Sequence, residues 1–344
     1  MHQTQSPSDQ QYQIKTVELE ITNVCSHYCP YCYNGDLDKS NAPFFSPVET
    51  LYKIIDKVAS YGAEKIILLG GDPATHPKLI DLLRYIKQHT HMMVVLMSNT
   101  LEFKNSNLAE IAPLIDEVQL TVHGATAEEH ETFCKAKHGT YHTVVTRLKE
   151  LQLHGIPVAI AINIIPQTHL NIYNITNAIT TQGVAISSLL LQRILPCGRA
   201  EGTDIYNVNK AQIKKVFQQL QRIENELHID ISFEDPFPLC YVEPHNYKFL
   251  HPCPGGISKI ALKGDGSIMS CVAIADSGIG NILTDTYEDA WVHNRFFESL
   301  RNMSYLTNEK CSSCPLSEKC RGGCPTQYIS AETEGDNFYD KFER

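Results

Sequence analysis

The chain has 344 residues, of which 42% are hydrophobic and 20% are charged, an ordinary composition that excludes a largely disordered protein. Its 39 acidic and 29 basic residues give a net charge of −10, which argues against the phosphate backbone of a nucleic acid as a partner. No apolar run reaches the roughly 18 residues that a membrane span needs, and the length favours a barrel-like catalytic domain with a smaller second domain.

Twelve cysteines would indicate disulfide bonds in a secreted protein. However, the first eleven residues are polar, and no apolar stretch typical of a signal peptide precedes residue 17. We therefore expect a cytoplasmic protein in which many of the thiols are metal ligands.

Between residues 17 and 200, short runs rich in β-branched residues alternate with amphipathic stretches. The runs predict strands at residues 17–22, 64–69, 92–97, 117–122, 157–165 and 185–192. The stretches between them predict helices at residues 48–60, 77–89, 141–154 and 170–182. The first helix is expected to have Ser46 as its cap, Pro47 at its first position and Glu49 completing a capping box. Such repeats predict a parallel sheet with helices on its outside, an α/β fold of the partial (β/α)6 TIM-barrel type.

Three cysteines lie close together directly after the first predicted strand. Cys25, Cys29 and Cys32 form a Cys-x3-Cys-x2-Cys run, with the aromatic Tyr31 before the last thiol. No nearby cysteine supplies a fourth ligand. Three thiolates can hold a four-iron cluster and leave one iron open for another ligand. A zinc site, or thiols without any ligand role, are the alternatives.

The carboxyl ends of the next strands carry further candidate ligands, because a parallel α/β sheet places its working groups there. The second strand is followed by Gly70, Gly71 and Asp72, where the glycines permit a ligand to approach the backbone. The third strand ends at Ser98 and Asn99, although an asparagine at a strand end is often only a turn residue.

The last three predicted strands end in polar residues as well. Thr121 and His123 close the fourth strand, Asn163 lies in the fifth, and Arg193 and Arg199 follow the sixth. His123 could exchange a proton with a substrate or only form a structural hydrogen bond. An arginine matches a carboxylate in its geometry, although a surface ion pair is the competing interpretation.

The remainder of the chain is expected to form a helix, a bridge and a cysteine-rich unit. Residues 209–228 have helical periodicity, residues 231–248 are rich in proline and aromatic residues without a clear period, and residues 259–262 and 267–272 predict a hairpin. The second group of cysteines comprises Cys253, Cys271, Cys311, Cys314, Cys320 and Cys324. Thiols this dense stabilise a small loop-rich unit through a metal. Cys134 and Cys197 fit no ligand spacing and are predicted to be buried fillers.

The spacing from Cys25 to Cys32 resembles the cluster-binding motif of the radical S-adenosylmethionine (SAM) enzymes. The second group of cysteines resembles the SPASM extension of those enzymes, which holds auxiliary iron–sulfur clusters. The resemblance covers residues 14 to 326. We therefore expect a polar leader at residues 1–13, a radical SAM partial barrel at 14–208, a helix with a bridging segment at 209–252, a SPASM domain at 253–326 and a tail at 327–344.

The resemblance also implies the ligands of each cofactor. Cys25, Cys29 and Cys32 would hold a 4Fe–4S cluster that binds SAM. The candidate SAM contacts are Tyr31, Gly70, Gly71, Asp72, Ser98, Asn99, Thr121, Asn163, Arg193 and Arg199. Cys253, Cys271 and Cys324 would hold one auxiliary cluster, with Cys240 as a possible fourth ligand. Cys311, Cys314 and Cys320 would hold a second auxiliary cluster, whose fourth ligand would be Asp336, Asp340, an exogenous group or absent.

The activity that the resemblance implies is reductive cleavage of SAM to methionine and a 5′-deoxyadenosyl radical, which abstracts hydrogen from a substrate. Most SPASM proteins act on peptides, so we expect an oxidoreductase that cross-links or epimerises a ribosomally made precursor peptide, with His123 as a candidate acid or base. No leader-binding domain is expected before residue 17 or after Cys324. A separate peptide-recognition protein and an electron donor such as flavodoxin or ferredoxin are therefore expected partners.

Three other interpretations stay open. A sulfatase-maturing enzyme is the nearest, but that group has an acidic residue directly after the cysteine of its Gly-x4-Cys element, where this chain has Val272 after Cys271. A radical SAM dehydrogenase that acts on a sugar is the second. A zinc-stapled binding module without activity is the third, and metal analysis distinguishes it from the others.

Overall fold

The computed structural model describes residues 12–35, 43–103, 105–269, 271–273 and 278–330. The strands are β1 (Thr16–Thr22), β2 (Lys65–Gly70), β3 (Met93–Met97), β4 (Glu117–Thr121), β5 (Val158–Asn163), β6 (Ser188–Gln192), β7 (Asp230–Phe233), β8 (Lys259–Lys263) and β9 (Ile268–Met269). The α-helices are α2 (Val48–Ser60), α3 (Leu79–His89), α4 (Asn105–Ile111), α5 (Ala127–Phe133), α6 (Thr140–Leu153), α7 (Ile172–Thr181), α8 (Lys210–Leu227), α9 (Arg295–Arg301), α10 (Glu309–Ser312), α11 (Ser317–Cys320) and α12 (Pro325–Ser330). Short 3-10 or π-helical turns are η1 (Pro73–Thr75), η2 (Ala112–Leu114), η3 (Gly198–Ala200), η4 (Leu239–Tyr241), η5 (Pro244–Phe249) and η6 (Glu288–Val292). Within these described ranges, no helix combines the length and the apolar character needed to cross a bilayer.

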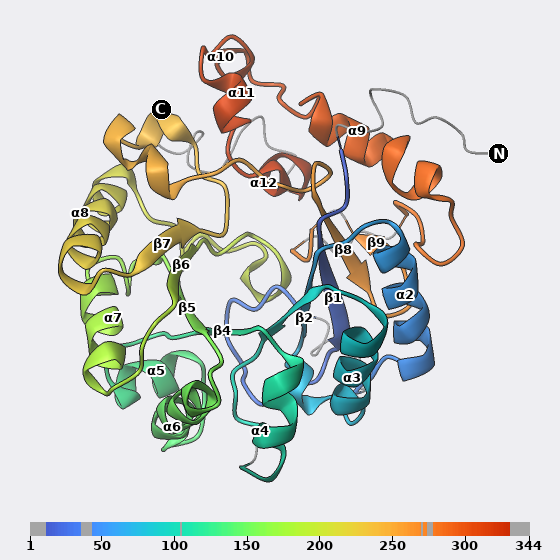
Figure 1. Cartoon of the computed structure of the whole chain (residues 1–344). Coiled ribbons are helices and arrows are strands. Elements are labelled where there is room, and N and C mark those ends of the chain that lie inside the picture. Colours follow the sequence, from blue (N-terminus) through green and yellow to red (C-terminus); the bar gives the residue numbers. More distant parts are fainter. Residues whose placement is uncertain (1–11, 36–42, 104, 270, 274–277, 331–344) are drawn as a thin grey trace.

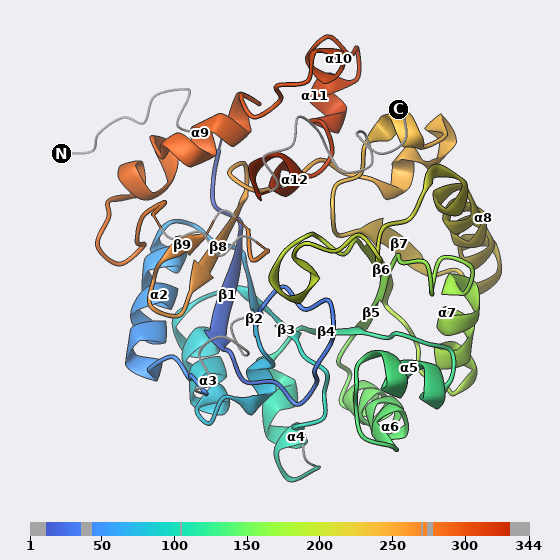
Figure 2. The ribbon, with the colours of Figure 1, turned by 180° about the vertical axis from the view of Figure 1, so that it is seen from behind.

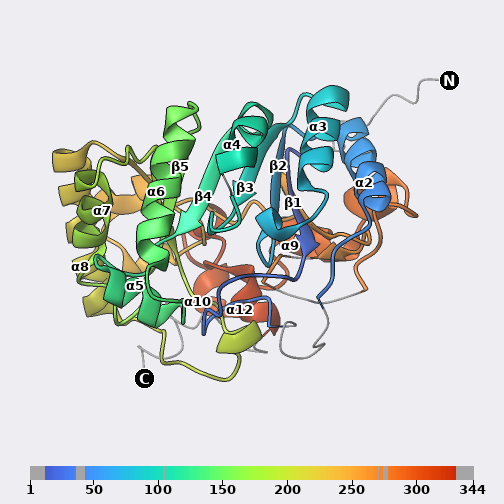
Figure 3. The ribbon, with the colours of Figure 1, turned by 90° about the horizontal axis from the view of Figure 1, so that it is seen from below.

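All the strands belong to one sheet with the order β7-β6-β5-β4-β3-β2-β1-β8-β9. Strands β1 to β6 each pair in parallel with the next one along the chain, β8 is parallel to β1, and β9 is antiparallel to β8. Figure 1 shows the strands as an open arc with α2 to α8 around its outer side and α9 to α12 on the side that the arc leaves open, and Figure 2 shows the same arrangement from behind. The view from below in Figure 3 places α2, α3, α4 and α6 in this outer layer. The predicted partial barrel of parallel β/α repeats is confirmed.

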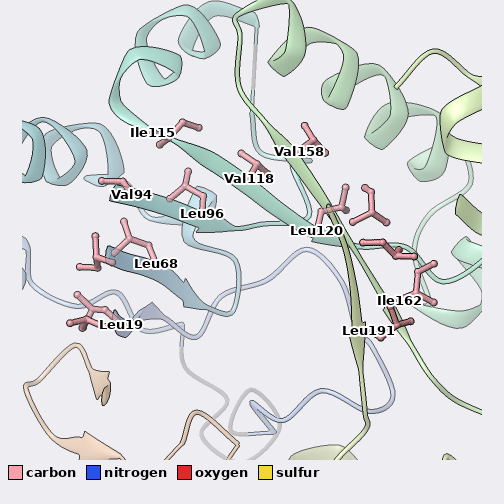
Figure 4. Close-up of a cluster of buried hydrophobic side chains, with 14 of the residues drawn as sticks. Leu19, Leu68, Val94, Leu96, Ile115, Val118, Leu120, Val158, Ile162 and Leu191 are labelled. Atoms are coloured by element: carbon pink, nitrogen blue, oxygen red, sulfur yellow. The ribbon is translucent and has the colours of Figure 1, made fainter. Parts of the chain in front are cut away.

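The two faces of the arc differ in polarity, because alternate residues of a strand point to opposite sides. Buried apolar side chains on the outer side pack under the helices (Figure 4), among them Leu19, Leu68, Leu96, Leu120, Ile162 and Leu191. The intervening positions are polar on several strands and include Glu18, Glu20, Gln119 and Asn163. The hydrophobic core therefore lies between sheet and helices, while the inner face presents polar groups to the centre of the barrel.

Helix α2 is held by its apolar stripe and not by the predicted cap. Leu51, Ile54, Ile55 and Val58 are its buried residues. Pro47 is the N-cap and no side chain caps the helix, so the capping box predicted from Ser46 and Glu49 is wrong. The backbone N–H of Ser46 donates instead to Ile21 in β1 at 3.0 Å. Its hydroxyl is turned toward Gly264, where an added Cβ would lie 1.8 Å from the Ser46 oxygen. The attachment to β1 thus directs this side chain away from the helix.

The segment predicted as a bridge supplies another strand of the barrel. Residues 230 to 233 form β7, which pairs in parallel with β6. A strand of four residues is too short to show a period of two, which explains why the sequence pattern missed it. The predicted hairpin is confirmed as β8 and β9, which continue the barrel sheet through β1; β8 ends one residue later than expected and β9 is shorter than expected. The domain boundaries at residues 208 and 253 stay a prediction.

Candidate active site

The three clustered cysteines lie in the loop that follows β1, at the carboxyl end of the sheet. Arg199, in η3, holds this loop in place through hydrogen bonds to its backbone. Its backbone N–H donates to the carbonyl of Cys32 at 3.0 Å, and its guanidinium donates to the carbonyl of Cys29 at 2.8 Å. The guanidinium also lies over the ring of Tyr28, 4.0 Å from the centroid. Arg199 therefore holds the backbone of the cysteine loop, and its contact with the carboxylate of SAM stays a prediction.

Gly198 lets the segment after β6 come close to the same loop. Its φ is +57°, a left-handed conformation, and an added Cβ would lie 2.3 Å from the carbonyl oxygens of both Cys32 and Tyr33. Any side chain at this position would push the last turn of the loop away. The path of the loop around Cys32 therefore depends on a glycine at position 198.

The thiols of the loop form a donor set that fits an iron–sulfur cluster. All three are free and partly buried. Burial, the carboxylate of Asp72 and the neighbouring thiol of Cys32 together raise the pKa of Cys25 to about 12. Burial raises the pKa of Cys29 as well. Two N–H groups donate to the sulfur of Cys25, from the backbone of His27 at 3.4 Å and from the amide of Asn99 at 3.7 Å. Neighbouring buried thiols become thiolates together only with a positive charge among them, and the iron of a cluster provides that charge.

Asp72 ties the end of β2 to the end of β3. Its side chain is 1% exposed. One carboxylate oxygen accepts hydrogen bonds from the hydroxyl of Ser98 at 2.8 Å and from the N–H of Ala74 at 2.9 Å. The other oxygen accepts from the N–H of Asn99 at 3.0 Å. Burial raises the pKa of Asp72 to about 6, although these donors act in the opposite direction. The carboxylate is thus engaged within the protein, which favours the main chain of this segment for the predicted SAM contact.

The two glycines before Asp72 allow β2 to lie against the start of the cysteine loop. An added Cβ on Gly70 would meet the carbonyl oxygen of Thr22 at 2.2 Å, and one on Gly71 would meet that of Val24 at 2.2 Å. The N–H of Gly71 donates to Thr22 at 2.7 Å, and that of Asp72 donates to Val24 at 2.6 Å. These two glycines therefore allow the backbone of β2 to pack closely against the backbone of the cysteine loop, and their contact with SAM stays a prediction.

Behind the loop, Tyr31 and His123 face each other. The phenolic oxygen lies 3.2 Å from Nε2 of His123. Burial lowers the pKa of His123 well below its ordinary value, so the imidazole is neutral at pH 7 and is a proton acceptor rather than a charged donor. Asn163, at the end of β5, is 3% exposed, and its Nδ2 has no hydrogen-bond partner among the described residues, although it lies near enough to Tyr31 to influence the pKa of the phenol. Such a buried amide donor suits a polar group of a ligand. Thr121 ends β4 on the inner face.

Beneath the loop, His27, His130 and Cys134 each bring one possible ligand atom within 4.8 Å of the others. Nδ1 of His130 accepts the backbone N–H of His123 at 3.3 Å, which leaves the ring proton on Nε2. The thiol of Cys134 donates to the carbonyl of His130 at 2.9 Å. A protonated nitrogen and a donating thiol are not metal ligands in this form, so we interpret this group as packing beneath the loop. Cys134 is fully buried, as predicted, whereas Cys197 is only partly buried.

In the second cysteine group, Cys253 and Cys271 lie beside a buried ion pair. Lys259 in β8 pairs with Glu18 in β1 at 2.8 Å. Burial acts to lower the pKa of Lys259, but Glu18 and the two thiols together raise it above its ordinary value. This ammonium is a positive charge next to the two thiols, and it favours their ionisation as ligands.

The other thiols of the second group lie near α10 to α12 and the turn after β7. The N–H of Leu239 donates to the sulfur of Cys320 at 3.3 Å. Cys240, the next residue, lies within electrostatic reach of Cys320, Cys311 and Cys314, and its predicted role as a possible fourth ligand in the group of Cys253 stays a prediction. Cys324 is buried and directly precedes α12. The other predicted ligands, Asp336 and Asp340, lie outside the described residues.

The sequence pattern missed two carboxyl groups at the carboxyl end of β7, because it missed the strand. Asp235 accepts the backbone N–H of Arg193 at 2.8 Å, and the guanidinium of Arg193 donates to the carbonyl of Pro236 at 3.0 Å. Burial raises the pKa of Asp235 and of Glu234. Carboxyl groups with a raised pKa at the active end of a barrel are candidates for proton transfer with a substrate. The predicted contact of Arg193 with SAM stays a prediction.

Comparison with known proteins agrees with this site. The sequence matches the radical SAM superfamily over residues 19–177. The antilisterial bacteriocin subtilosin biosynthesis protein AlbA of Bacillus subtilis (strain 168) is 24% identical over 311 residues, which cover 89% of this chain and 66% of AlbA. The AdoMet-dependent heme synthase of Methanosarcina barkeri (strain Fusaro / DSM 804) is 21% identical over 326 residues, 90% of each protein.

Among solved structures, Streptococcus suis SuiB bound to precursor peptide SuiA has a TM-score of 0.76 with 15% sequence identity, and the match covers 96% of this chain and 76% of SuiB. At this identity the likeness shows the fold alone. The chain thus shares its fold with SuiB and spans 66% of the length of AlbA.

Proposed function

Since residues 19–177 form a radical SAM domain, we propose that the protein is a radical SAM enzyme that modifies a ribosomally made precursor peptide. The observation that carries the proposal is the loop after β1, where three partly buried thiols lie together at the carboxyl end of the sheet. A 4Fe–4S cluster bound by Cys25, Cys29 and Cys32 would supply the electron that splits SAM into methionine and a 5′-deoxyadenosyl radical.

The residues around the loop position these thiols and the SAM molecule. Arg199 and Gly198 set the path of the loop backbone. Asp72 joins the ends of two strands on which predicted SAM contacts lie. Nδ2 of Asn163, which has no hydrogen-bond partner within the described ranges, offers a buried donor to a polar ligand atom. Because most of these groups are held by hydrogen bonds within the protein, the site is organised before a ligand arrives.

The inner face of the barrel supplies the groups that would face the substrate. The ion pair of Glu18 and Lys259 and the carboxyl groups of Glu234 and Asp235 influence one another's pKa, so they lie in one region. Hydrogen abstraction from carbon followed by bond formation also requires removal of a proton. A carboxyl group with a raised pKa suits that step, and His123, neutral against Tyr31, is the other candidate acceptor.

The similarity to AlbA, named for biosynthesis of a bacteriocin, and the shared fold with SuiB, whose structure contains a precursor peptide, support a peptide substrate. A small-molecule substrate is the second candidate, supported by the similarity to a heme synthase. A sulfatase-maturing activity is less well supported, because Val272 stands where that group has its acidic residue. A peptide-recognition protein, a flavodoxin or ferredoxin as electron donor and a cytoplasmic location complete the proposal.

Mass spectrometry tests the substrate. Anaerobically reconstituted protein, reductant and SAM are incubated with short peptides encoded beside the gene, with the Cys25→Ala variant as control. The proposal predicts a loss of mass by hydrogen for a cross-link, or deuterium uptake from D2O for an epimerised centre, with the wild-type protein alone. Unchanged peptides together with turnover of a porphyrin substrate would favour the small-molecule alternative. Metal analysis that finds zinc and no iron would favour a binding module.

A further inference from the structure

Four thiols from two distant parts of the chain meet on the side of the molecule where the C-terminal helices lie. Cys240 is in η4, shortly after β7, whereas Cys311, Cys314 and Cys320 lie in α10, in the following loop and in α11. Figure 1 shows α10 and α11 on the same side of the molecule as the turns that follow β7. The N–H of Leu239 donates to the sulfur of Cys320 at 3.3 Å and joins the two parts directly.

The backbone after α11 turns back toward the sulfur of Cys320. Arg321, Gly322 and Gly323 have φ values of 52°, 72° and 90°, three left-handed residues in succession. Through this turn the N–H of Gly323 donates to the carbonyl of Cys320 at 3.1 Å, and the N–H groups of Gly322 and Gly323 lie close enough to the Cys320 thiol to oppose the effect of burial on its pKa. Successive backbone N–H groups that converge on one point form an anion site, and here they favour a thiolate.

The other thiols of the group lie in a similar setting. The N–H of Leu316 donates to the sulfur of Cys314 at 3.4 Å. Burial and the three other thiols of the group together raise the pKa of Cys240 to about 12, which places all four thiols within electrostatic reach of one another. The hydroxyl of Tyr247 donates to the carbonyl of Leu239 at 3.3 Å and holds η4 in place beside them. Backbone N–H groups that point at sulfur stabilise the negative charge of the thiolates that hold an iron–sulfur cluster.

We propose that Cys240 is the fourth ligand of the cluster held by Cys311, Cys314 and Cys320. In the SPASM spacing the fourth thiol comes after the last Cys-x3-Cys pair, whereas residues 325–344 contain no cysteine. The ligand comes instead from the segment after β7, so the bound cluster joins the far edge of the barrel to the C-terminal helices. The identity of the metal group as an iron–sulfur cluster rests on the proposed function, whereas the choice of Cys240 rests on the contacts of η4.

Iron analysis of the reconstituted full-length protein tests the ligand. Cys240→Ala leaves three thiols, which can still hold a four-iron cluster with one open iron, so a chelator is expected to remove about four iron atoms per chain faster from this variant than from wild type. Cys134→Ala is the matched control, because its thiol already donates to the carbonyl of His130, and it is expected to release iron at the wild-type rate. Iron release from Cys240→Ala at the wild-type rate, or the same acceleration in a variant with Asp336 and Asp340 both changed to alanine, would overturn the proposal.

Alkylation of the wild-type chain gives a second test that needs no variant to fold. Cys240 is solvent-exposed. Iodoacetamide is therefore expected to label its thiol quickly after a chelator has removed the iron, and slowly in the iron-loaded protein. Equal labelling in the two states would contradict ligation. Binding of zinc in place of the missing iron, with Cys240 protected, would overturn the cluster assignment.

Failure of this inference is distinguishable from failure of the proposed function. Loss of iron from the C-terminal site alone leaves the loop of Cys25, Cys29 and Cys32 filled. SAM cleavage by Cys240→Ala in the absence of substrate reports on that loop separately. A wild-type protein that binds iron at η4 and never cleaves SAM would contradict the proposed function and leave the ligand assignment intact.

Discussion

Replacing Gly198 by alanine perturbs the cysteine loop without changing any thiol. The new Cβ would lie 2.3 Å from two carbonyl oxygens, of Cys32 and Tyr33, whereas real contacts of this kind essentially never fall below 3.0 Å. The loop must therefore shift by about 0.7 Å at Cys32, and a displacement approaching 1 Å at a reacting centre lowers rates by up to about 100-fold. Gly198→Ala also carries a cost of about 1–2 kcal/mol for a left-handed alanine.

Gly202→Ala separates these two effects. Gly202 has a φ of +73° and nothing within 4 Å of its added Cβ, so this variant has the same backbone cost and no collision. Both variants are expected to lose about 1–2 kcal/mol in the free energy of unfolding, measured with urea on the metal-free protein. Only Gly198→Ala should lose SAM cleavage, by about 10- to 100-fold, measured as 5′-deoxyadenosine formed per bound cluster. Equal cleavage rates in the two variants would show that the contact with Cys32 does not position the loop.

Two further predictions concern buried charges. Lys259→Met leaves Glu18, whose side chain is 9% exposed, without its partner, and should destabilise the protein by about 3–5 kcal/mol. Lys15→Met removes an ion pair with Glu64 whose side chains are 54% and 67% exposed, and should change the free energy of unfolding by less than about 1 kcal/mol; similar losses in the two would refute burial as the cause. Burial lowers the pKa of His130 from 6.5 to about 4, so the unfolded chain binds the extra proton first and stability falls as the pH drops from 6.5 to 4. In His130→Gln this fall should be smaller by about 3 kcal/mol in urea titrations of the metal-free protein, and an unchanged pH dependence would exclude His130 as its source.

The barrel could be predicted from the sequence because its signals are local. Each of the six predicted strands is a short run rich in β-branched residues and corresponds to a strand from β1 to β6, and four of them are followed by a predicted helix with a stripe of apolar residues. The three thiols of the loop are likewise close in sequence, so their proximity follows from the chain itself. Position in a parallel sheet then brings the other strand ends toward them.

The rest depends on contacts between residues distant in the chain. Nothing within a few residues of Ser46 shows that β1 holds its backbone and directs its hydroxyl away from α2. The hydrogen bonds between Asp72 and Ser98 and between Arg199 and Cys29 depend on which loops lie together at the carboxyl end of the sheet. The pairing of η4 with α11 brings Cys240 to Cys320 across eighty residues, which spacing alone did not indicate. The order of the strands was readable, but the partners of polar side chains were not.

The most direct test of the function is the release of 5′-deoxyadenosine. Protein reconstituted with iron and sulfide under anaerobic conditions is mixed with SAM and dithionite, and the products are separated by liquid chromatography. Wild-type protein should form 5′-deoxyadenosine and methionine in equal amounts, and alanine variants of Cys25, Cys29 and Cys32 should form neither. Iron-loaded wild-type protein that forms no 5′-deoxyadenosine, or a variant without all three thiols that still forms it, would contradict the assignment of this loop as the site of SAM cleavage.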